Sequence, residues 1–197
     1  MTTLPHLSLS LMLLTTTAFL LAGLVKGVVG LGLPTLAMAL LALAMPPAQA
    51  AALLILPSLV TNVWQMRPWP TLAPMTRRLW PMQAGVVAGT LGGAWLLGAP
   101  AGAWAMQALG AALVVYGLWG LSGARVSQVP AGAERVLGPL VGAVTGLVTA
   151  ATGVFVIPAV PYLQALGLSR DELVQTMGLS FTVSTVALAA GLMLNGQ

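Results

Sequence analysis

Long apolar runs, separated by short polar segments, make up almost the whole chain. A membrane-spanning helix needs about 20 apolar residues, because each residue adds about 1.5 Å and the hydrocarbon core is about 30 Å thick. Runs of this kind predict spans over residues 8–26, 27–45, 48–66, 79–98, 103–122 and 173–194. A longer run, 138–167, is interrupted by glycine and proline and is predicted to form a helical hairpin. The pattern therefore predicts an all-α, polytopic integral membrane protein.

The composition of the chain agrees with a membrane-embedded protein. Only 5% of the 197 residues are charged, whereas soluble domains carry about 25%. Seven basic and three acidic residues give a net charge of +4, but the basic residues lie mainly in short loops. In such loops they indicate topology rather than nucleic-acid binding. We therefore expect the lipid bilayer, and no nucleic acid, as a partner.

The basic residues orient the predicted spans. If the segment 67–78, with its three arginines, lies in the cytoplasm, the next two spans return the chain there at the loop 123–137, which contains Arg125. The hairpin 138–167 then brings Arg170 to the same side. The N-terminus lies outside in this arrangement, and no Arg or Lys lies in an outer loop, as the positive-inside rule requires.

Two parts of the chain resemble each other. Residues 21–29 and 140–148 share five of nine positions at an offset of 119. Further matches at an offset of 124 join Pro34 to Pro158, Ser58 to Thr182 and Thr61 to Thr185. The predicted topology makes the two copies run in opposite senses, as in the inverted repeats of secondary transporters. We predict a first repeat with following spans over 1–122 and a shorter, incomplete second repeat over 138–197, each beginning with a Gly/Pro-broken hairpin.

The glycine-rich stretch 23–34, GLVKGVVGLGLP, resembles the N-terminal motif of the TauE/SafE sulfite exporter family, also described as toluene sulfonate uptake permeases. The second copy, from Gly142 to Pro158 and on to 166–172, is similar to the second motif of that family. The resemblance implies passage of a small anion, such as sulfite, a sulfonate or a related sulfur compound, across the bacterial inner membrane. A coupling proton and a homo-oligomer are further partners that this hypothesis allows.

Lys26 is the only charged residue within the long apolar runs. A lysine at the centre of a membrane helix costs about 2.5–3.5 kcal/mol on insertion scales, so such a position is usually functional. Lys26 would then attract an anion near the transport path. The alternative is that Lys26 lies at the cytoplasmic turn of a full-depth hairpin and only follows the positive-inside rule. Its depth decides between these two interpretations.

Glycines close to prolines form a second group of candidates. Glycine and proline together weaken a helix, so we expect broken helices there, with free N–H groups that can bind an anion. For the pairs Gly23–Gly27 and Gly142–Gly146, the alternative is close helix packing between small residues. The candidate substrate-binding residues in this group are Gly30, Gly32, Pro34, Gly153 and Pro158.

Polar side chains within the predicted spans form a third group. On the span 48–66 they recur at the spacing i, i+3, i+4, i+7, so they share one helical face. Hydroxyl and amide groups can bind an oxyanion without a fixed charge, and Asn62 is the first of them to test. The alternative is hydrogen bonding between helices. The candidates taken from this group are Thr61, Asn62, Thr182 and Thr185.

Several function classes lack the residues that they need. No Asp or Glu lies within an apolar run, which argues against a cation pump or a carboxylate proton relay. The chain has no cysteine and one histidine, so we predict no metal site, no cofactor and no enzyme activity. The remaining hypothesis is a permease or secondary transporter for a small anion. The alternative is a non-transporting membrane subunit, a scaffold or a truncated transporter remnant.

Overall fold

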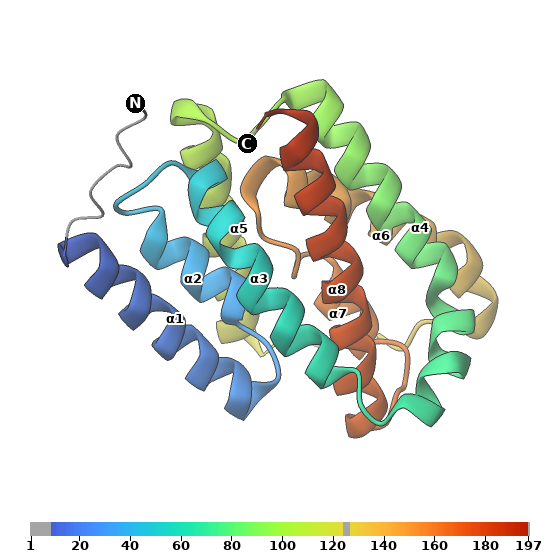
Figure 1. Ribbon diagram of the computed structural model, residues 1–197. Helices are drawn as coiled ribbons and strands as arrows, with labels where there is room; N and C mark the ends of the chain where they lie inside the picture. Colours follow the sequence, from blue (N-terminus) through green and yellow to red (C-terminus); the bar gives the residue numbers. More distant parts are fainter. Residues whose placement is uncertain (1–8, 124–126, 197) are drawn as a thin grey trace.

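The computed structural model describes residues 9–123 and 127–196, and within these ranges its regular structure is entirely helical (Figure 1). Five of the helices, α1, α3, α5, α6 and α8, are long and apolar enough to cross a membrane. The N-terminus, which was predicted to lie on the outer side of the membrane, is not among the described residues, and neither is Arg125 of the loop 123–137. The elements are α1 (Leu9–Val29), α2 (Leu33–Leu41), α3 (Pro47–Gln65), η1 (Trp69–Thr71), α4 (Leu72–Leu97), α5 (Gly102–Ser122), α6 (Ala131–Thr152), α7 (Ala159–Gln164) and α8 (Arg170–Leu194).

Two stretches of the chain have the same order of elements. In each, a long helix ends at a glycine-containing break, a short helix follows, and a second long helix completes the unit. These stretches are α1–α2–α3, with a first break over residues 30–32, and α6–α7–α8, with a second break over residues 153–158. The nine residues of α2 extend only about 14 Å, which is too short to cross a hydrocarbon core. The short helices therefore reach only part of the way across a membrane.

The first break lies later in the chain than the pattern predicted. We expected one span to end at Lys26 and the next to cover 27–45, but α1 continues through Lys26 to Val29. The turn is made by Gly30 and Gly32, which have φ angles of 80° and 111°. Such positive φ angles favour glycine, whereas a single glycine inside a helix, such as Gly27, costs only about 1 kcal/mol and does not end it.

Other helices extend further into polar sequence than hydropathy indicates. The segment 67–78 was expected to be a loop, but α4 begins at Leu72, and α6 begins at Ala131 within the expected loop 123–137. At the start of α8, the Ser169 hydroxyl accepts a hydrogen bond from the Glu172 N–H, and the Glu172 carboxylate accepts one from the Ser169 N–H at 2.9 Å. This capping box fixes where α8 begins.

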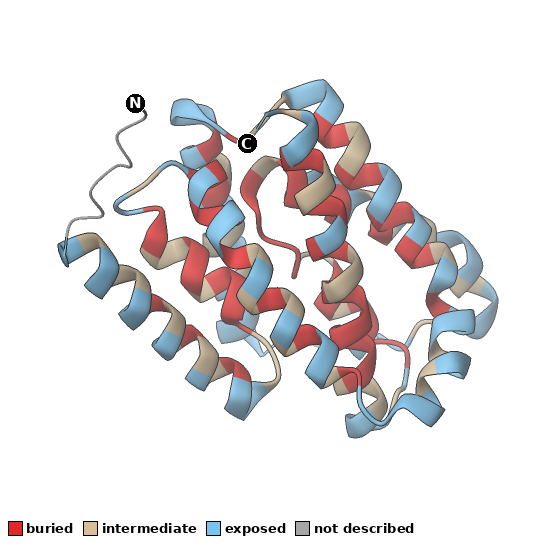
Figure 2. Ribbon diagram, in the orientation of Figure 1, coloured by how far each residue is buried: buried red, intermediate tan, exposed pale blue. Residues whose placement is uncertain are grey.

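The core is built mainly by α2, α3, α4, α7 and α8, and it also contains the second break. Val154, Phe155 and Val156 in that break are fully buried, and the Phe155 ring lies 5.3 Å from the ring of Phe181 in α8, centroid to centroid. Figure 2 shows buried residues concentrated at the centre of the bundle, with much of α1 exposed at its edge. Large exposed apolar side chains on the outer helices, such as Leu24 and Leu118, suit contact with lipid.

Glycines bring α4 and α6 into backbone contact. A Cβ atom added at Gly142 or Gly146 of α6 would overlap the backbone of α4. In the opposite direction, a Cβ at Gly85 or Gly89 of α4 would overlap the backbone of α6. The two helices therefore form a small-residue interface, which is the packing alternative considered for the pair Gly142–Gly146.

The segments before α6 and after α7 lie together. The Val129 N–H donates to the Ala165 carbonyl at 2.9 Å, and Arg78 donates to the Leu166 carbonyl at 3.1 Å. Arg78 also forms an ion pair with Glu134 in the first turn of α6, with an N–O distance of 2.6 Å. The chain thus leaves and returns to the same end of the bundle, which is the geometry that a hairpin over 138–167 requires.

Candidate functional site

Lys26 lies in the last turn of α1, and its side chain points into the protein. The residue is 7% exposed, and its Nζ atom donates to Thr61 Oγ1 at 3.0 Å and to Asn62 Oδ1. Within the described ranges no carboxylate pairs with Lys26; the ion pair found there joins Arg78 and Glu134. The ammonium charge is therefore held by neutral oxygens alone.

The position of Lys26 agrees in part with each interpretation, the anion-attracting charge and the marker of topology. The residue lies about 5 Å along the helix axis from the end of α1, so it is near one end of a full-length helix rather than at its centre. It is nevertheless buried among helices, unlike a lysine that only marks a cytoplasmic loop. Burial of an unpaired charge is costly, so this position calls for a role beyond topology.

Asn62 connects the lysine to the other half of the chain. Its amide oxygen accepts from Lys26, and its amide nitrogen donates to Thr185 Oγ1 at 3.4 Å. Thr185 in turn donates to the carbonyl of Phe181 at 2.6 Å, and both Asn62 and Thr185 are at most 1% exposed. The chain of hydrogen bonds spans α1, α3 and α8 and orients the Asn62 amide.

Gln65, one turn beyond Thr61 and Asn62 on α3, fastens the first break. Its amide nitrogen donates to the Gly30 carbonyl at 2.8 Å and to the Val174 carbonyl at 3.1 Å. Gly30 belongs to the break after α1, and Val174 lies in the first turns of α8. One side chain therefore joins the ends of three helices.

A cleft of about 480 Å³ lies beside the lysine, between α1 and α3. Lys26 is the only charged residue in the lining of this cleft, and Thr61 and Gln65 contribute the other polar side chains. The cleft wall is otherwise apolar or backbone, from Gly23, Gly27, Gly30, Val60, Trp64 and Val174. A Cβ added at Gly23 or Gly27 would meet no atom within 4 Å, so this glycine pair lines open space rather than a helix interface.

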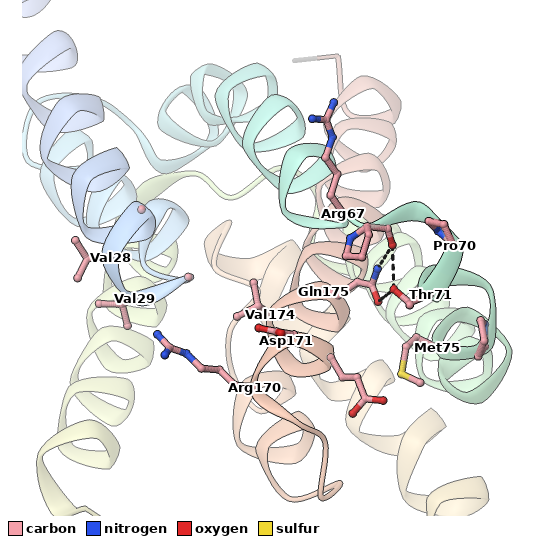
Figure 3. A pocket seen from close by; sticks show the side chains of 15 residues that line it. Val28, Val29, Arg67, Pro70, Thr71, Met75, Arg170, Asp171, Val174 and Gln175 are labelled. Atoms are coloured by element: carbon pink, nitrogen blue, oxygen red, sulfur yellow. Dashed lines mark hydrogen bonds between the residues drawn. The ribbon is translucent and has the colours of Figure 1, made fainter.

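A wider vestibule of about 860 Å³ adjoins the cleft and shares Gly27, Gly30 and Val174 with it. Figure 3 shows Arg170 extending from the start of α8 toward Val29 at the end of α1. The vestibule carries both signs of charge, since two arginines and two acidic residues line it. It therefore forms a polar mouth that leads to a cleft with a single positive charge.

The far wall of the vestibule is held by Gln175 of α8. Its amide nitrogen donates to the carbonyls of Met66 at 2.8 Å and Pro68 at 2.6 Å. Its amide oxygen accepts from the Thr71 hydroxyl at 3.1 Å, as the dashed lines in Figure 3 indicate. These bonds fix the connection between α3 and α4 against α8.

Comparison with known families decides what kind of protein carries this cleft. The family model described as Sulfite exporter TauE/SafE matches residues 15–197, a range that contains both breaks and Lys26. The chain belongs to the sulfite exporter TauE/SafE family. The resemblance seen in the glycine-rich stretches is thus confirmed, and this TauE/SafE chain is a membrane protein of a transporter family. Searches of the curated proteins and of the solved structures gave no match.

Four of the predicted site residues of this TauE/SafE chain come together. Lys26, Thr61, Asn62 and Thr185 form one hydrogen-bonded set, and Gly30 adjoins it at the cleft wall. The polar face expected on the span 48–66 is therefore turned toward both α1 and α8. Thr61, Asn62 and Gln65 make the interhelical bonds of the packing alternative, and Thr61 and Gln65 also line the cleft. The fourth member, Ser58, is buried without a hydrogen-bond partner among the described residues.

Three other predicted residues lie near this set but outside the cleft. Gly32 precedes the first residue of α2, and Pro34 is buried in the first turn of that helix. Thr182 donates to the Gly178 carbonyl at 2.8 Å and contacts the sulfur of Met66 at 3.9 Å. Gly32 and Pro34 shape the break, whereas Thr182 takes part in packing.

The second break does not join the cleft. A Cβ at Gly153 would lie 3.0 Å from the end of the Met38 side chain and 3.2 Å from Ala51, near the start of α3. The first break is bonded to Gln65 at the opposite end of α3. The positions on α3 that the two breaks contact, Ala51 and Gln65, lie about 21 Å apart along the helix. Gly153 and Pro158 thus belong to a different break from the one at the cleft, and their role in substrate binding stays a prediction.

Some residues of the site were not among the predicted ones. Gln65 shares the helical face of Thr61 and Asn62, so its spacing carried a usable signal. Arg67 and Arg170 were interpreted only as topology markers, yet both line the vestibule. Val174 carried no signal, because its contribution is a backbone carbonyl and an apolar wall. Among residues 9–123 and 127–196, no cluster of three or more His, Cys, Asp or Glu could hold a metal ion.

We predict that Gly32→Val abolishes transport. Valine at a φ angle of 111° is strained by about 1–3 kcal/mol, and its Cβ would lie 3.0 Å from the Val25 side chain of α1. Flux of labelled sulfite and sulfonate into proteoliposomes measures the effect. Gly123→Ala is the matched control, because Gly123 also has a positive φ but a Cβ there meets no atom within 4 Å. Equal flux in both variants would contradict a role for the first break.

Proposed function

We propose that this chain is a permease that carries a small anion, namely sulfite, a sulfonate or a related sulfur compound, across the bacterial inner membrane. Family membership supports the substrate class. The observation that carries the proposal is the buried Lys26 ammonium, which is bonded only to neutral oxygens and lies beside an open cleft. In the protein alone the Lys26 charge has no counter-charge among the described residues. An anion that enters the cleft supplies one, and this makes its binding favourable.

The donors around the cleft support anion binding. A lysine ammonium has three N–H donors, and Thr61 and Asn62 accept two of them, which leaves one for a substrate oxygen. The vestibule gives the anion an approach from the arginine-bearing end of the bundle. The absence of an acidic side chain from the cleft lining keeps the local potential positive.

An inverted repeat is part of the same proposal. It is supported by the shared order of long helix, break, short helix and long helix in α1–α3 and α6–α8, and by the position of the two breaks at opposite ends of α3. The positive-inside rule places the end with Arg67 and Arg170 in the cytoplasm and the N-terminus outside. The alternative of a non-transporting subunit, scaffold or remnant gains no support from the cleft.

Flux in proteoliposomes that contain the purified chain tests the function. Labelled sulfite and a labelled sulfonate are supplied with and without a pH gradient, and the size of the reconstituted particle is measured in the same preparation. Saturable flux is expected, with acceleration by the gradient if a proton is coupled and a multimeric particle if the chain forms a homo-oligomer. Absence of flux from folded protein would contradict the proposal.

We predict that Asn62→Ala also abolishes transport. The substitution removes the oxygen that holds the Lys26 ammonium and the nitrogen that bonds Thr185, so the lysine loses its orientation in the cleft. The same flux assay measures the loss. Thr90→Val is the control, because the buried Thr90 hydroxyl on α4 has no partner within the described residues, and the change preserves shape. Wild-type flux in Asn62→Ala would exclude Asn62 from the site.

A further inference from the structure

A separate hollow, of about 310 Å³, lies between the N-terminal turns of α4 and α6, where these helices run side by side (Figure 1). It shares no lining residue with the vestibule or the cleft. Its lining contains three arginines and one glutamate, so its net charge is +2. The lining residues are Arg77, Arg78, Trp80, Pro81, Ala131, Glu134 and Arg135.

The four charged side chains of this hollow divide into two kinds. Arg78 and Glu134 neutralise each other in a two-bond pair, with Nε–O and Nη2–O distances of 2.9 and 2.6 Å, and Arg78 also bonds the Leu166 carbonyl. These contacts hold the wall in place. Arg77 and Arg135 have no ion-pair partner in the part of the chain that the structure describes, and both are exposed. They are therefore available to an anionic group from outside.

The hollow lies at the boundary between charged and apolar surface. Trp80 lines it and is 62% exposed, as expected of a tryptophan at the level of the lipid headgroups. One and two turns beyond Trp80, on the same side of α4, Ala84, Val87 and Ala88 are exposed apolar residues. A group in the hollow thus has an apolar helix surface directly beside it.

We propose that this hollow binds the headgroup of an anionic phospholipid, with Arg77 and Arg135 contacting the phosphate and the acyl chains lying along the apolar surface of α4. A basic pocket between membrane helices at the interface has the charge and position for such a headgroup. Arginine suits the contact because its planar donors can bind two phosphate oxygens at once. The apolar surface beyond the arginines selects a lipid over a free phosphate ion. The site depends on the membrane location of the chain and not on its transport substrate.

Native mass spectrometry of the detergent-solubilised full chain tests the site, with dioleoylphosphatidylglycerol as the anionic probe and dioleoylphosphatidylcholine as the neutral one. Wild type is expected to retain phosphatidylglycerol in preference. Each arginine contributes about fivefold to the attraction for an anionic lipid, so the double variant Arg77→Gln/Arg135→Gln is expected to bind about 25-fold more weakly. Because both side chains are exposed, the variant is expected to fold, and its helical circular dichroism is compared with that of wild type.

Two controls make the result specific. Arg67→Gln/Arg170→Gln removes the same charge from the vestibule and is expected to retain phosphatidylglycerol as wild type does. Inorganic phosphate, added in excess over the lipid, is expected to leave the lipid adduct intact. Full lipid retention by the Arg77→Gln/Arg135→Gln variant would overturn the proposal. Displacement of the lipid by inorganic phosphate would also overturn it, since the site would then bind free phosphate.

Discussion

Replacing Lys26 by methionine is expected to lower sulfite and sulfonate flux by roughly 10- to 100-fold while leaving the protein folded. Hydrogen bonds to charged groups contribute about 1.5–3 kcal/mol, and the ammonium supplies the only charge in the cleft. Methionine keeps a long, flexible side chain in the same space. It also removes a buried charge that has no carboxylate partner among the described residues, so the variant is expected to unfold at the same temperature as wild type or above it.

The stability measurement separates a transport defect from a folding defect. If Lys26 served only to hold α1 against α3, its loss would lower the unfolding temperature together with the flux, because its bonds to Thr61 and Asn62 join these helices. Lys26→Arg retains the charge and is expected to keep part of the flux. Full flux in Lys26→Met would show that the anion does not depend on this charge, and the proposed site would then be wrong.

The second large effect is expected at the interface of α4 and α6. In Gly146→Ala the new Cβ would overlap the Val86 carbonyl and lie 2.5 Å from the Thr90 nitrogen, so the two helix backbones must separate. Overpacking of this kind costs about 1–3 kcal/mol. Gly27→Ala is the matched variant, because Gly27 corresponds to Gly146 at the offset of 119 but a Cβ there meets no atom within 4 Å.

Thermal unfolding in detergent, followed by tryptophan fluorescence, compares the two alanine variants. Gly146→Ala is expected to unfold at a lower temperature than wild type. Gly27→Ala is expected to equal wild type or to exceed it slightly, since alanine is the better helix former by about 1 kcal/mol. Equal destabilisation by both substitutions would mean that the glycine pair of α1 is also packed against a helix.

Hydropathy was sufficient to predict an all-helical membrane protein, because spans of about 20 apolar residues are set by bilayer thickness. It could not place every helix end. The break after α1 depends on the positive φ angles of Gly30 and Gly32, which apolarity does not encode. The starts of α4 and α8 lie in polar sequence, and at α8 the capping box of Ser169 fixes the first residue where hydrophobicity cannot.

The part of the candidate site that lies on a single helix, α3, could be predicted from the sequence. The spacing of Thr61, Asn62 and Gln65 placed them on one face of α3, and that face is turned toward the lysine. The meeting of Lys26 with Asn62 and Thr185 requires three helices to cross, which spacing within a single helix cannot specify. The separation of the two breaks is likewise a property of tertiary packing, since each break alone has the same sequence character.

The glycine interface also determines how the bundle can move. At Gly85, Gly89, Gly142 and Gly146 the backbones of α4 and α6 touch with no side chain between them, which leaves no room for a sliding motion, and we expect the two helices to behave as one rigid frame. α1 packs mainly against α2 and is tied to the rest by the bonds of Lys26 to α3 and by Gln65 at the following break. Neutral hydrogen bonds such as those of Gln65 contribute only about 0.5–1.5 kcal/mol each. Because α2 is buried in the core whereas most of α1 is exposed, thermal motion can swing α1 against the frame more easily than α2, and the lysine moves with it.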